Sequence, residues 1–257
     1  MSGDMENNTG SDMGNGTDDR TFRDDLFAGR TVLVVGGTSG IGAGIAHAFA
    51  RLGAEVTVTG ATQEECAGSA HRAVAADVRD EPAMARVIDG LAQLDVLVNC
   101  AGIIRRGAEL DVATFETVLA INLTGTMRAC TLARPKLAAT GGAIVNTASM
   151  LSFFGGGLVP GYSASKGGVA QLTKSLAIAY AREGIRVNAI APGWVDTPLT
   201  KALRADPARD AAILARTPLG RWAVPGDIAG AVVFLCSPAA RYITGAVLPV
   251  DGGYLVA

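Results

Sequence analysis

Tyr162 and Lys166 are four residues apart in the run Tyr-Ser-Ala-Ser-Lys, and Ser149 lies thirteen residues upstream. On a helix this spacing places the two side chains on one face. There the lysine ammonium would favour the phenolate and lower the tyrosine pKa from its usual value of about 10. The Ser149 hydroxyl could hydrogen-bond a substrate oxygen that gains or loses a proton. The three residues therefore predict proton exchange of the kind that accompanies hydride transfer.

A glycine pattern supplies the second half of that chemistry. Gly36, Gly40 and Gly42 directly follow the apolar run Thr31–Val35 and precede a helical stretch. An apolar, β-branched run is typical of a buried parallel strand. Glycines let backbone amides approach a pyrophosphate, and the N-terminal end of the next helix attracts its charge. The segment predicts a nucleotide site, and a plain tight turn is the alternative if the segment is considered alone.

Apolar strands alternate with helical stretches along most of the chain. We expect strands near 31–35, 55–59, 73–76, 95–98, 143–147, 186–190 and 246–250, and helices near 40–52, 63–70, 81–92, 113–138, 161–183 and 226–236. This alternation predicts one α/β domain over residues 25–257, a Rossmann-type doubly wound parallel sheet of about seven strands with helices on both faces. Residues 1–24 are rich in Gly, Asn, Asp, Ser and Thr, and we expect a disordered tail there.

Composition excludes several classes of function. The chain has 257 residues and a net charge of −2, so nothing favours nucleic acid or an anionic membrane as a partner. The polar N-terminus does not resemble a signal peptide, and the four cysteines are scattered without Cys-x-x-Cys. We therefore expect a cytoplasmic protein without a metal site and without a membrane span.

Small or polar motifs follow five of the predicted strands. They are Gly36–Gly42, Asp77, Asn99–Gly102, Ser149 and Pro192–Gly193. Since ligands of parallel sheets bind beyond the carboxyl ends of the strands, these motifs should meet in one crevice.

Together these motifs resemble the short-chain dehydrogenase/reductase family from Leu26 to the C-terminus. The resemblance implies an enzyme that moves a hydride between a nicotinamide cofactor and a secondary alcohol or ketone. It assigns catalysis to Ser149, Tyr162 and Lys166, with Lys166 lowering the Tyr162 pKa, and it gives Asn122 the role of holding a proton-relay water. The cofactor-binding residues that it implies are Gly36, Thr38, Ser39, Gly40, Ile41, Gly42, Thr62, Asp77, Val78, Asn99, Ala101, Gly102, Tyr162, Lys166, Pro192, Gly193, Val195 and Thr197.

Within that family the chain is most similar to 2-deoxy-D-gluconate 3-dehydrogenases, through Ala101–Arg106, Ala148–Phe153 and Gly220–Trp222. This likeness implies a sugar acid as the small-molecule substrate. Guanidinium groups could pair its carboxylate, and a lid over Leu199–Thr217 could help to select it. The candidate substrate-binding residues are Arg105, Arg106, Met150, Arg221 and Trp222. A solvated surface position is an equal alternative for Arg105 and Arg106, a core position for Met150, and closure of the loop after the lid for Arg221 and Trp222.

The end of the second strand usually decides between NAD and NADP. Its sequence, Thr59-Gly-Ala-Thr62, offers neither a carboxylate for a ribose 2′-hydroxyl nor a cation for a 2′-phosphate. Without a cation, the 2′-phosphate of NADP loses strong charge-assisted hydrogen bonds, whereas the 2′-hydroxyl of NAD loses only one modest hydrogen bond without a carboxylate. We therefore favour NAD and keep Thr62 as a residue that could serve NADP.

Two other functions remain open at this point. A 3-oxoacyl-carrier-protein reductase would share the fold and the catalytic set, and a nucleotide sensor without turnover would share the fold. The presence of Asn122, Ser149, Tyr162 and Lys166 together argues against the sensor, because sensing needs no proton relay. The long apolar helices near 113–138 and 161–183, which the family pairs across a twofold axis, predict a homodimer or homotetramer.

Overall fold

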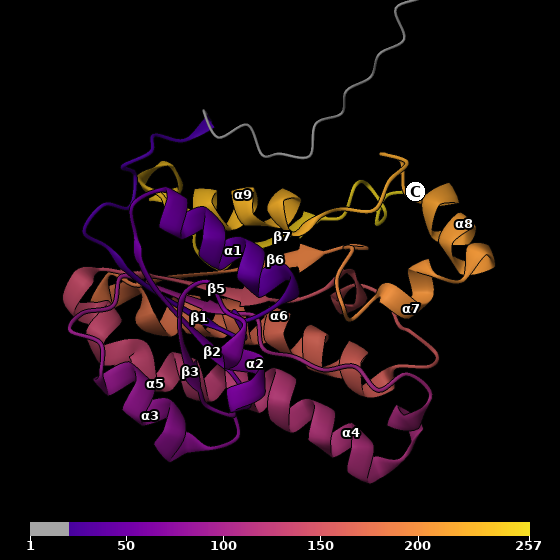
Figure 1. The fold of residues 1–257 in the computed structure, drawn as a ribbon, viewed down its shortest axis with the longest axis horizontal. Helices are drawn as coiled ribbons and strands as arrows, with labels where there is room; N and C mark the ends of the chain where they lie inside the picture. Colours follow the sequence, from indigo (N-terminus) through magenta and orange to yellow (C-terminus); the bar gives the residue numbers. More distant parts are fainter. Residues whose placement is uncertain (1–20) are drawn as a thin grey trace, which may run out of the picture.

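The computed structural model describes residues 21–257 and contains one seven-stranded sheet (Figure 1). All strand pairs are parallel, and the order is β3-β2-β1-β4-β5-β6-β7. The strands are β1 (Thr31–Val35), β2 (Glu55–Gly60), β3 (Arg72–Ala75), β4 (Val96–Asn99), β5 (Ala143–Thr147), β6 (Arg186–Pro192) and β7 (Val247–Val250). The predicted fold class is therefore confirmed, and the order reverses between β1 and β4, where a doubly wound sheet opens its crevice.

Helices cover both faces of the sheet (Figure 1). One face packs on α1 (Gly40–Arg51) and α9 (Pro225–Cys236), and the other on α3 (Glu81–Asp89), α5 (Gly125–Thr140) and α6 (Pro160–Tyr180). Successive strand residues point to opposite faces, so Val32 and Val34 enter one core while Leu33 and Val35 enter the other. The buried strands are apolar on both sides for this reason.

The helix predicted over 113–138 is interrupted. It consists of α4 (Val112–Leu119), a π-helical segment η3 (Ala120–Thr124) and α5. A π-helical turn contains one residue more than an α-helical turn requires, and such turns often lie at functional sites. Here the π-helical turn contains the fully buried Asn122.

The shorter elements complete the chain. The predicted lid forms α7 (Lys201–Arg204) and α8 (Pro207–Ala215), which Figure 1 shows beyond the carboxyl ends of the strands. The stretch predicted as a helix over 63–70 is only α2 (Gln63–Ala67). The remaining short elements are η2 (Ala108–Leu110), η4 (Met150–Ser152), η5 (Ala181–Glu183) and η6 (Pro238–Ala240).

Most of the predicted tail, residues 1–20, lies outside the described residues. Phe22 belongs to the stretch that the sequence assigned to the tail, yet it packs against the core beside α1 and α9. The contacts of the domain therefore begin before residue 25. Among residues 21–257, no helix combines the length and the apolar character that a membrane span needs.

Candidate active site

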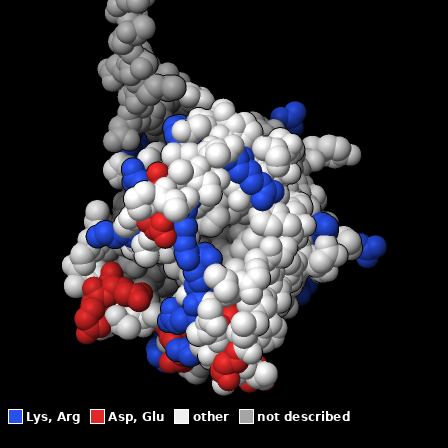
Figure 2. Space-filling view, turned by 90° about the vertical axis from the view of Figure 1, so that its right-hand side faces the viewer, with Lys and Arg blue, Asp and Glu red and all other residues white. Residues whose placement is uncertain are grey.

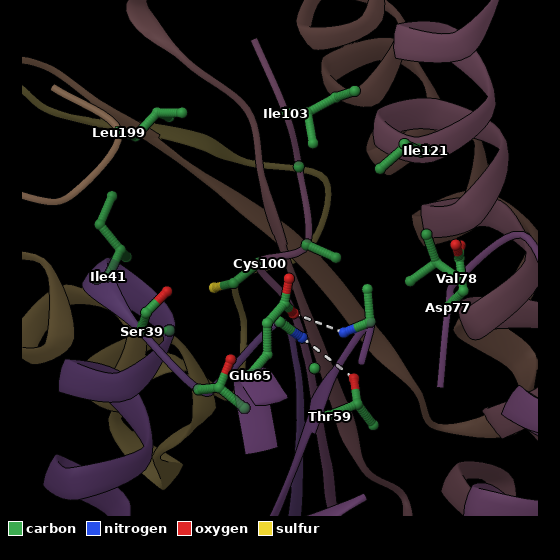
Figure 3. A pocket seen from close by; sticks show the side chains of 18 of the residues that line it. Ser39, Ile41, Thr59, Glu65, Asp77, Val78, Cys100, Ile103, Ile121 and Leu199 are labelled. Atoms are coloured by element: carbon green, nitrogen blue, oxygen red, sulfur yellow. Dashed lines mark hydrogen bonds between the residues drawn. The ribbon is translucent and has the colours of Figure 1, made fainter. Parts of the chain in front are cut away.

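A cavity of about 650 Å³ lies at the carboxyl ends of β1, β2, β3 and β4, a size typical of cofactor sites. Figure 3 shows Ser39 and Ile41 on one side of it and Asp77 and Val78 on the other, with Cys100 between them. This cavity brings together the motifs Gly36–Gly42, Asp77 and Ala101–Gly102, whereas Ser149 and Pro192–Gly193 line a neighbouring cavity.

Two glycines make room for this cavity. Gly36 has a φ of +77°, and a Cβ there would lie 2.5 Å from the Ala101 backbone nitrogen. A Cβ on Gly42 would overlap the Gly36 carbonyl oxygen. The helix that follows, α1, has Ser39 as its N-cap, and this side chain makes no capping hydrogen bond. The first amides of α1 therefore remain available to an anion, as the pyrophosphate of a dinucleotide requires.

The structure brings most of the predicted cofactor residues to this cavity and leaves others aside. Those that line it are Gly36, Thr38, Ser39, Gly40, Ile41, Gly42, Asp77, Val78, Ala101, Gly102 and Thr197. Thr62 instead caps α2, where its hydroxyl accepts the Glu65 N–H at 3.3 Å. The Asn99 amide is buried and donates to the Asn146 side chain at 2.9 Å, so it faces the interior rather than the crevice.

The sequence analysis missed Glu65 and was wrong to expect no carboxylate at the end of the second strand. Its carboxylate lines the cavity beside Gly60 and accepts the Ala61 N–H at 2.7 Å (Figure 3). The end of β2 therefore does carry an acidic group, supplied from α2 rather than from the strand. The spacing of Thr62 and Glu65, which matches a capping box, is the signal that could have identified it.

Arg79 is a second lining residue that the sequence analysis missed. Its guanidinium binds Asp77 through contacts of 2.6, 3.1 and 3.1 Å. This pairing holds the pKa of the Asp77 carboxyl below its usual range, through the hydrogen bond first of all. The Arg79 guanidinium is thus already paired with a neighbouring carboxylate. Arg128 also lies close, where it donates to the Val78 carbonyl at 2.7 Å.

A second cavity, of about 440 Å³, is lined by two of the predicted catalytic residues, whereas Lys166 and Asn122 line neither cavity. Ser149, Met150 and Tyr162 line this second cavity, together with Pro192 at the end of β6 and Gly193, Val195 and Thr197 from the segment after it. Ile41, Thr197, Pro198 and Leu199 line both cavities, so the two spaces adjoin. Of the predicted cofactor residues, Ile41 and Thr197 therefore lie where the two spaces meet.

The electrostatics of Tyr162 differ from the prediction. Burial raises the pKa of Tyr162, and the negative charge of Glu109 raises it further, while a hydrogen bond with Ser149 opposes them. The Lys166 ammonium lies 5.6 Å from the tyrosine ring centroid and donates to the Thr147 carbonyl at 2.7 Å. The Lys166 ammonium is therefore not the group that sets the Tyr162 pKa in this structure, because it faces a carbonyl and not the phenol oxygen.

Lys166 is itself strongly perturbed. It is 3% exposed, and burial lowers its pKa to about 8. A lysine with a pKa this close to neutral can gain or lose its proton at a small cost in free energy when a charged or polar group binds beside it. This is typical of a functional lysine.

Asn122 is bound by the loop that follows β4. Its side chain accepts the Ile103 N–H at 2.8 Å and donates to the Ile103 carbonyl at 2.9 Å. It also donates to Ser165 at 3.1 Å. A methyl group added at Gly102 would lie 3.3 Å from Asn122 Oδ1 and 3.6 Å from Lys166 Nζ. Asn122 therefore joins α6 to the cavity wall beside Lys166.

The two adjacent arginines face different spaces. Arg106 lines the smaller cavity with the reacting groups, whereas Arg105 lines the larger one. Arg209 of α8, which the sequence analysis missed, also lines the smaller cavity, with its Nε paired to Asp206 at 3.3 Å. No local pattern identifies Arg209, because only the folding of the lid brings α8 to this wall.

Arg221 and Trp222 do not line this cavity, so the prediction that they bind substrate needs correction. Arg221 forms a two-point ion pair with Asp227 at 2.7 and 2.8 Å and borders a separate cavity with Trp194. The Trp222 side chain is buried, and its indole N–H donates to Asp210 at 2.6 Å. Both residues instead connect the lid to the start of α9.

Known proteins similar to this chain include dehydrogenases that act on hydroxylated acids. A family model described as enoyl-(acyl carrier protein) reductase matches residues 35–255. The chain is 44% identical over 246 residues to cis-4-hydroxycyclohexanecarboxylate dehydrogenase of Sinomonas cyclohexanicum, covering 90% of this chain and 98% of that protein. It is 42% identical over 241 residues to 2-dehydro-3-deoxy-D-gluconate 5-dehydrogenase of Bacillus subtilis, covering 88% of this chain and 95% of that protein.

A solved structure is similar along the same length. It is a candidate 2-deoxy-D-gluconate 3-dehydrogenase from Agrobacterium tumefaciens with bound NADP, 44% identical in sequence, with a TM-score of 0.83. The match covers 92% of this chain and all of that one.

Proposed function

The chain belongs to the short-chain dehydrogenase/reductase family and is an NAD(P)-dependent oxidoreductase, and we propose that its substrate is a hydroxylated carboxylic acid of the sugar-acid type. The reaction is oxidation of a secondary alcohol or the reverse reduction of a ketone, as in 2-deoxy-D-gluconate 3-dehydrogenases. Both curated relatives described above are named for substrates that carry a carboxylate.

One observation carries this proposal: Arg106 and Arg209 line the same cavity as Ser149 and Tyr162. Guanidinium groups bind carboxylates through paired, charge-assisted hydrogen bonds. Figure 2, which faces the side of the molecule where α7 and α8 lie in Figure 1, shows Lys and Arg side chains gathered in a band along a hollow. An anionic substrate is therefore attracted to the mouth and fixed beside the reacting groups.

The cofactor site fits a dinucleotide, because the glycine turn and the uncapped start of α1 offer amides to its phosphates. When bound, the cofactor supplies or accepts the hydride. Ser149 orients the substrate oxygen, and Tyr162 exchanges a proton with it. Because burial keeps the Tyr162 pKa raised, its phenol is protonated at neutral pH and serves as the acid for ketone reduction. For oxidation we propose that the Lys166 ammonium turns from the Thr147 carbonyl toward the Tyr162 oxygen and stabilises the phenolate.

The test compares gluconate with glucitol, which has an uncharged hydroxymethyl group in place of the carboxylate. We expect turnover of gluconate and related acids, followed by the nicotinamide absorbance, and no turnover after Tyr162→Phe, with cofactor binding retained. Arg106→Gln and Arg209→Gln should each raise the KM for the acid about tenfold, the effect of losing one charge-assisted bond. Turnover confined to uncharged polyols, or unaltered KM values in both arginine variants, would refute the carboxylate assignment.

For the cofactor we propose a preference for NAD. The Glu65 carboxylate at the end of β2 would repel a 2′-phosphate and can accept a hydrogen bond from a 2′-hydroxyl, and Arg79 is already paired with Asp77. Dissociation constants of both cofactors, measured side by side, test this. We expect Glu65→Gln to strengthen NADP binding and leave NAD binding within a few fold. Tenfold tighter binding of NADP by the unaltered protein would reverse the preference.

We further propose a homodimer or homotetramer assembled through the α4 and α6 side of the domain. Large apolar side chains are exposed there, with Ile178 81% exposed on α6 and Val112 69% exposed at the start of α4. Light scattering over a range of protein concentrations tests the assembly. A monomer mass throughout that range would contradict it.

A further inference from the structure

Glu109 is a buried carboxylate that lines neither the cofactor cavity nor the substrate cavity. It belongs to η2 and is only 1% exposed. A charged group this deep in a protein is costly unless hydrogen bonds compensate it. Its two oxygens each accept a backbone N–H, and both of these amides belong to segments that carry residues of the proposed site.

The first amide is that of Tyr162, which donates to Glu109 Oε2 at 2.7 Å. Tyr162 is the third residue of α6, so its N–H precedes the first hydrogen bond within the helix. A capping side chain normally accepts such an amide, but the residue at the N-cap is Val159, and the first turn contains no acidic residue. Glu109 therefore supplies, from 53 residues away, both the acceptor and the negative charge that this helix start lacks.

The second amide is that of Arg105, which donates to Glu109 Oε1 at 2.7 Å. The loop that contains Arg105 also carries Arg106, whose side chain lines the substrate cavity. A Cβ on Gly161 would lie 3.3 Å from Glu109 Oε2, so this close approach suits a residue without a side chain. One carboxylate thus joins the loop after β4 to the first turn of α6.

We propose that Glu109 is a positioning residue for the reaction, which holds Tyr162 in register with the loop that places Arg106 against the substrate. The inference depends on the proposed function, since Tyr162 and Arg106 act on the substrate only in that reaction. The charged and polar groups that face Tyr162 are Lys166 from α6, Ser149 at the N-cap of η4 and Glu109 from η2. Among these, Glu109 is the only one that opposes loss of the Tyr162 proton.

The test uses two variants of the full chain. Glu109→Gln keeps the size and one acceptor oxygen but removes the charge, and Glu109→Ala removes both bonds. We expect kcat to fall about tenfold in the first and about a hundredfold in the second, since small displacements of a catalytic group have effects of that order. In Glu109→Gln the acidic limb of the oxidation pH profile should move to lower pH, because the negative charge that raises the Tyr162 pKa is gone.

Amide hydrogen exchange provides a readout that needs no turnover. The Tyr162 amide should exchange faster in Glu109→Ala than in the unaltered protein, even if no hydroxy acid proves to be a substrate. Asp111→Asn is the matched control: this nearby carboxylate caps α4 through the Thr114 N–H at 2.9 Å and makes no contact with α6 that we observe, so kcat should stay within about twofold. Unchanged kcat in both Glu109 variants, or a fall in kcat without any movement of the pH limb or of the exchange rate, would overturn the proposal.

Discussion

Replacement of Lys166 by methionine should make the protein more stable at neutral pH while it removes activity. Burial lowers the Lys166 pKa from 10.5 to about 8. Since the unfolded chain holds this proton more tightly, the buried ammonium destabilises the fold by about 3 kcal/mol. That cost is present in full below the folded pKa of about 8 and disappears as the pH rises to 10.5, where the unfolded chain also releases its proton.

The methionine variant also loses the bond from Lys166 to the Thr147 carbonyl, which offsets the gain by about 1 kcal/mol. We therefore expect Lys166→Met to be about 2 kcal/mol more stable than the unaltered protein at neutral pH. Toward pH 10.5 the unaltered protein should become the more stable of the two, because its buried lysine no longer carries the charge that destabilised the fold.

Urea unfolding followed by tryptophan fluorescence, without cofactor, measures this difference across the pH range. Both proteins need the same concentration, because assembly contributes to stability. Lys174→Met is the control, since Lys174 is exposed on the same helix and its loss should leave the pH dependence unaltered. A stability difference between Lys166→Met and the unaltered protein that stays constant from neutral pH to pH 10.5 would refute the account of Lys166 given above.

Three further outcomes follow from the geometry. Gly42→Ala should weaken NAD(H) binding at least about tenfold in a fluorescence titration, because its methyl group would overlap the Gly36 carbonyl, whereas Gly68→Ala, with open space around it, should bind normally. Arg221→Ala should leave the KM for the acid within about twofold in steady-state kinetics, since its guanidinium is engaged by a carboxylate outside the substrate cavity; a tenfold increase would restore Arg221 as a substrate partner. Asn122→Ala should lower the free energy of unfolding by about 2 kcal/mol in a urea titration, because it leaves an N–H and a C=O of the loop after β4 without their partner; an unchanged midpoint would contradict this.

The sheet and the crevice were predictable because their determinants are local. A buried parallel strand needs a short β-branched run such as Thr31–Val35, and a turn that approaches a phosphate needs glycine where Gly36 and Gly42 stand. Each motif follows its own strand, and parallel pairing then brings the strand ends together. Physical chemistry over a few residues was sufficient for this part.

The corrected assignments depend on contacts between distant segments. Glu109 acts on an amide 53 residues away, and the lid places Arg209 where the sequence analysis expected Arg221. The hydrogen-bond partner of the Lys166 ammonium could not be predicted either. Helical spacing shows on which face of the helix a side chain lies, but not which group its terminal atom contacts. Such choices are made by packing and desolvation, which a single sequence pattern does not contain.

The π-helical segment Ala120–Thr124 requires a fixed number of residues between α4 and α5. Deleting one residue from it would permit an ordinary helix to continue, and everything on one side would turn by about 100° relative to the other. Asn122 would then leave its polar partners, although no side chain had been exchanged for another. We expect the segment to accept conservative replacements more readily than a single deletion, so a gap there in a related sequence would mark an enzyme in which the loop after β4 has other partners.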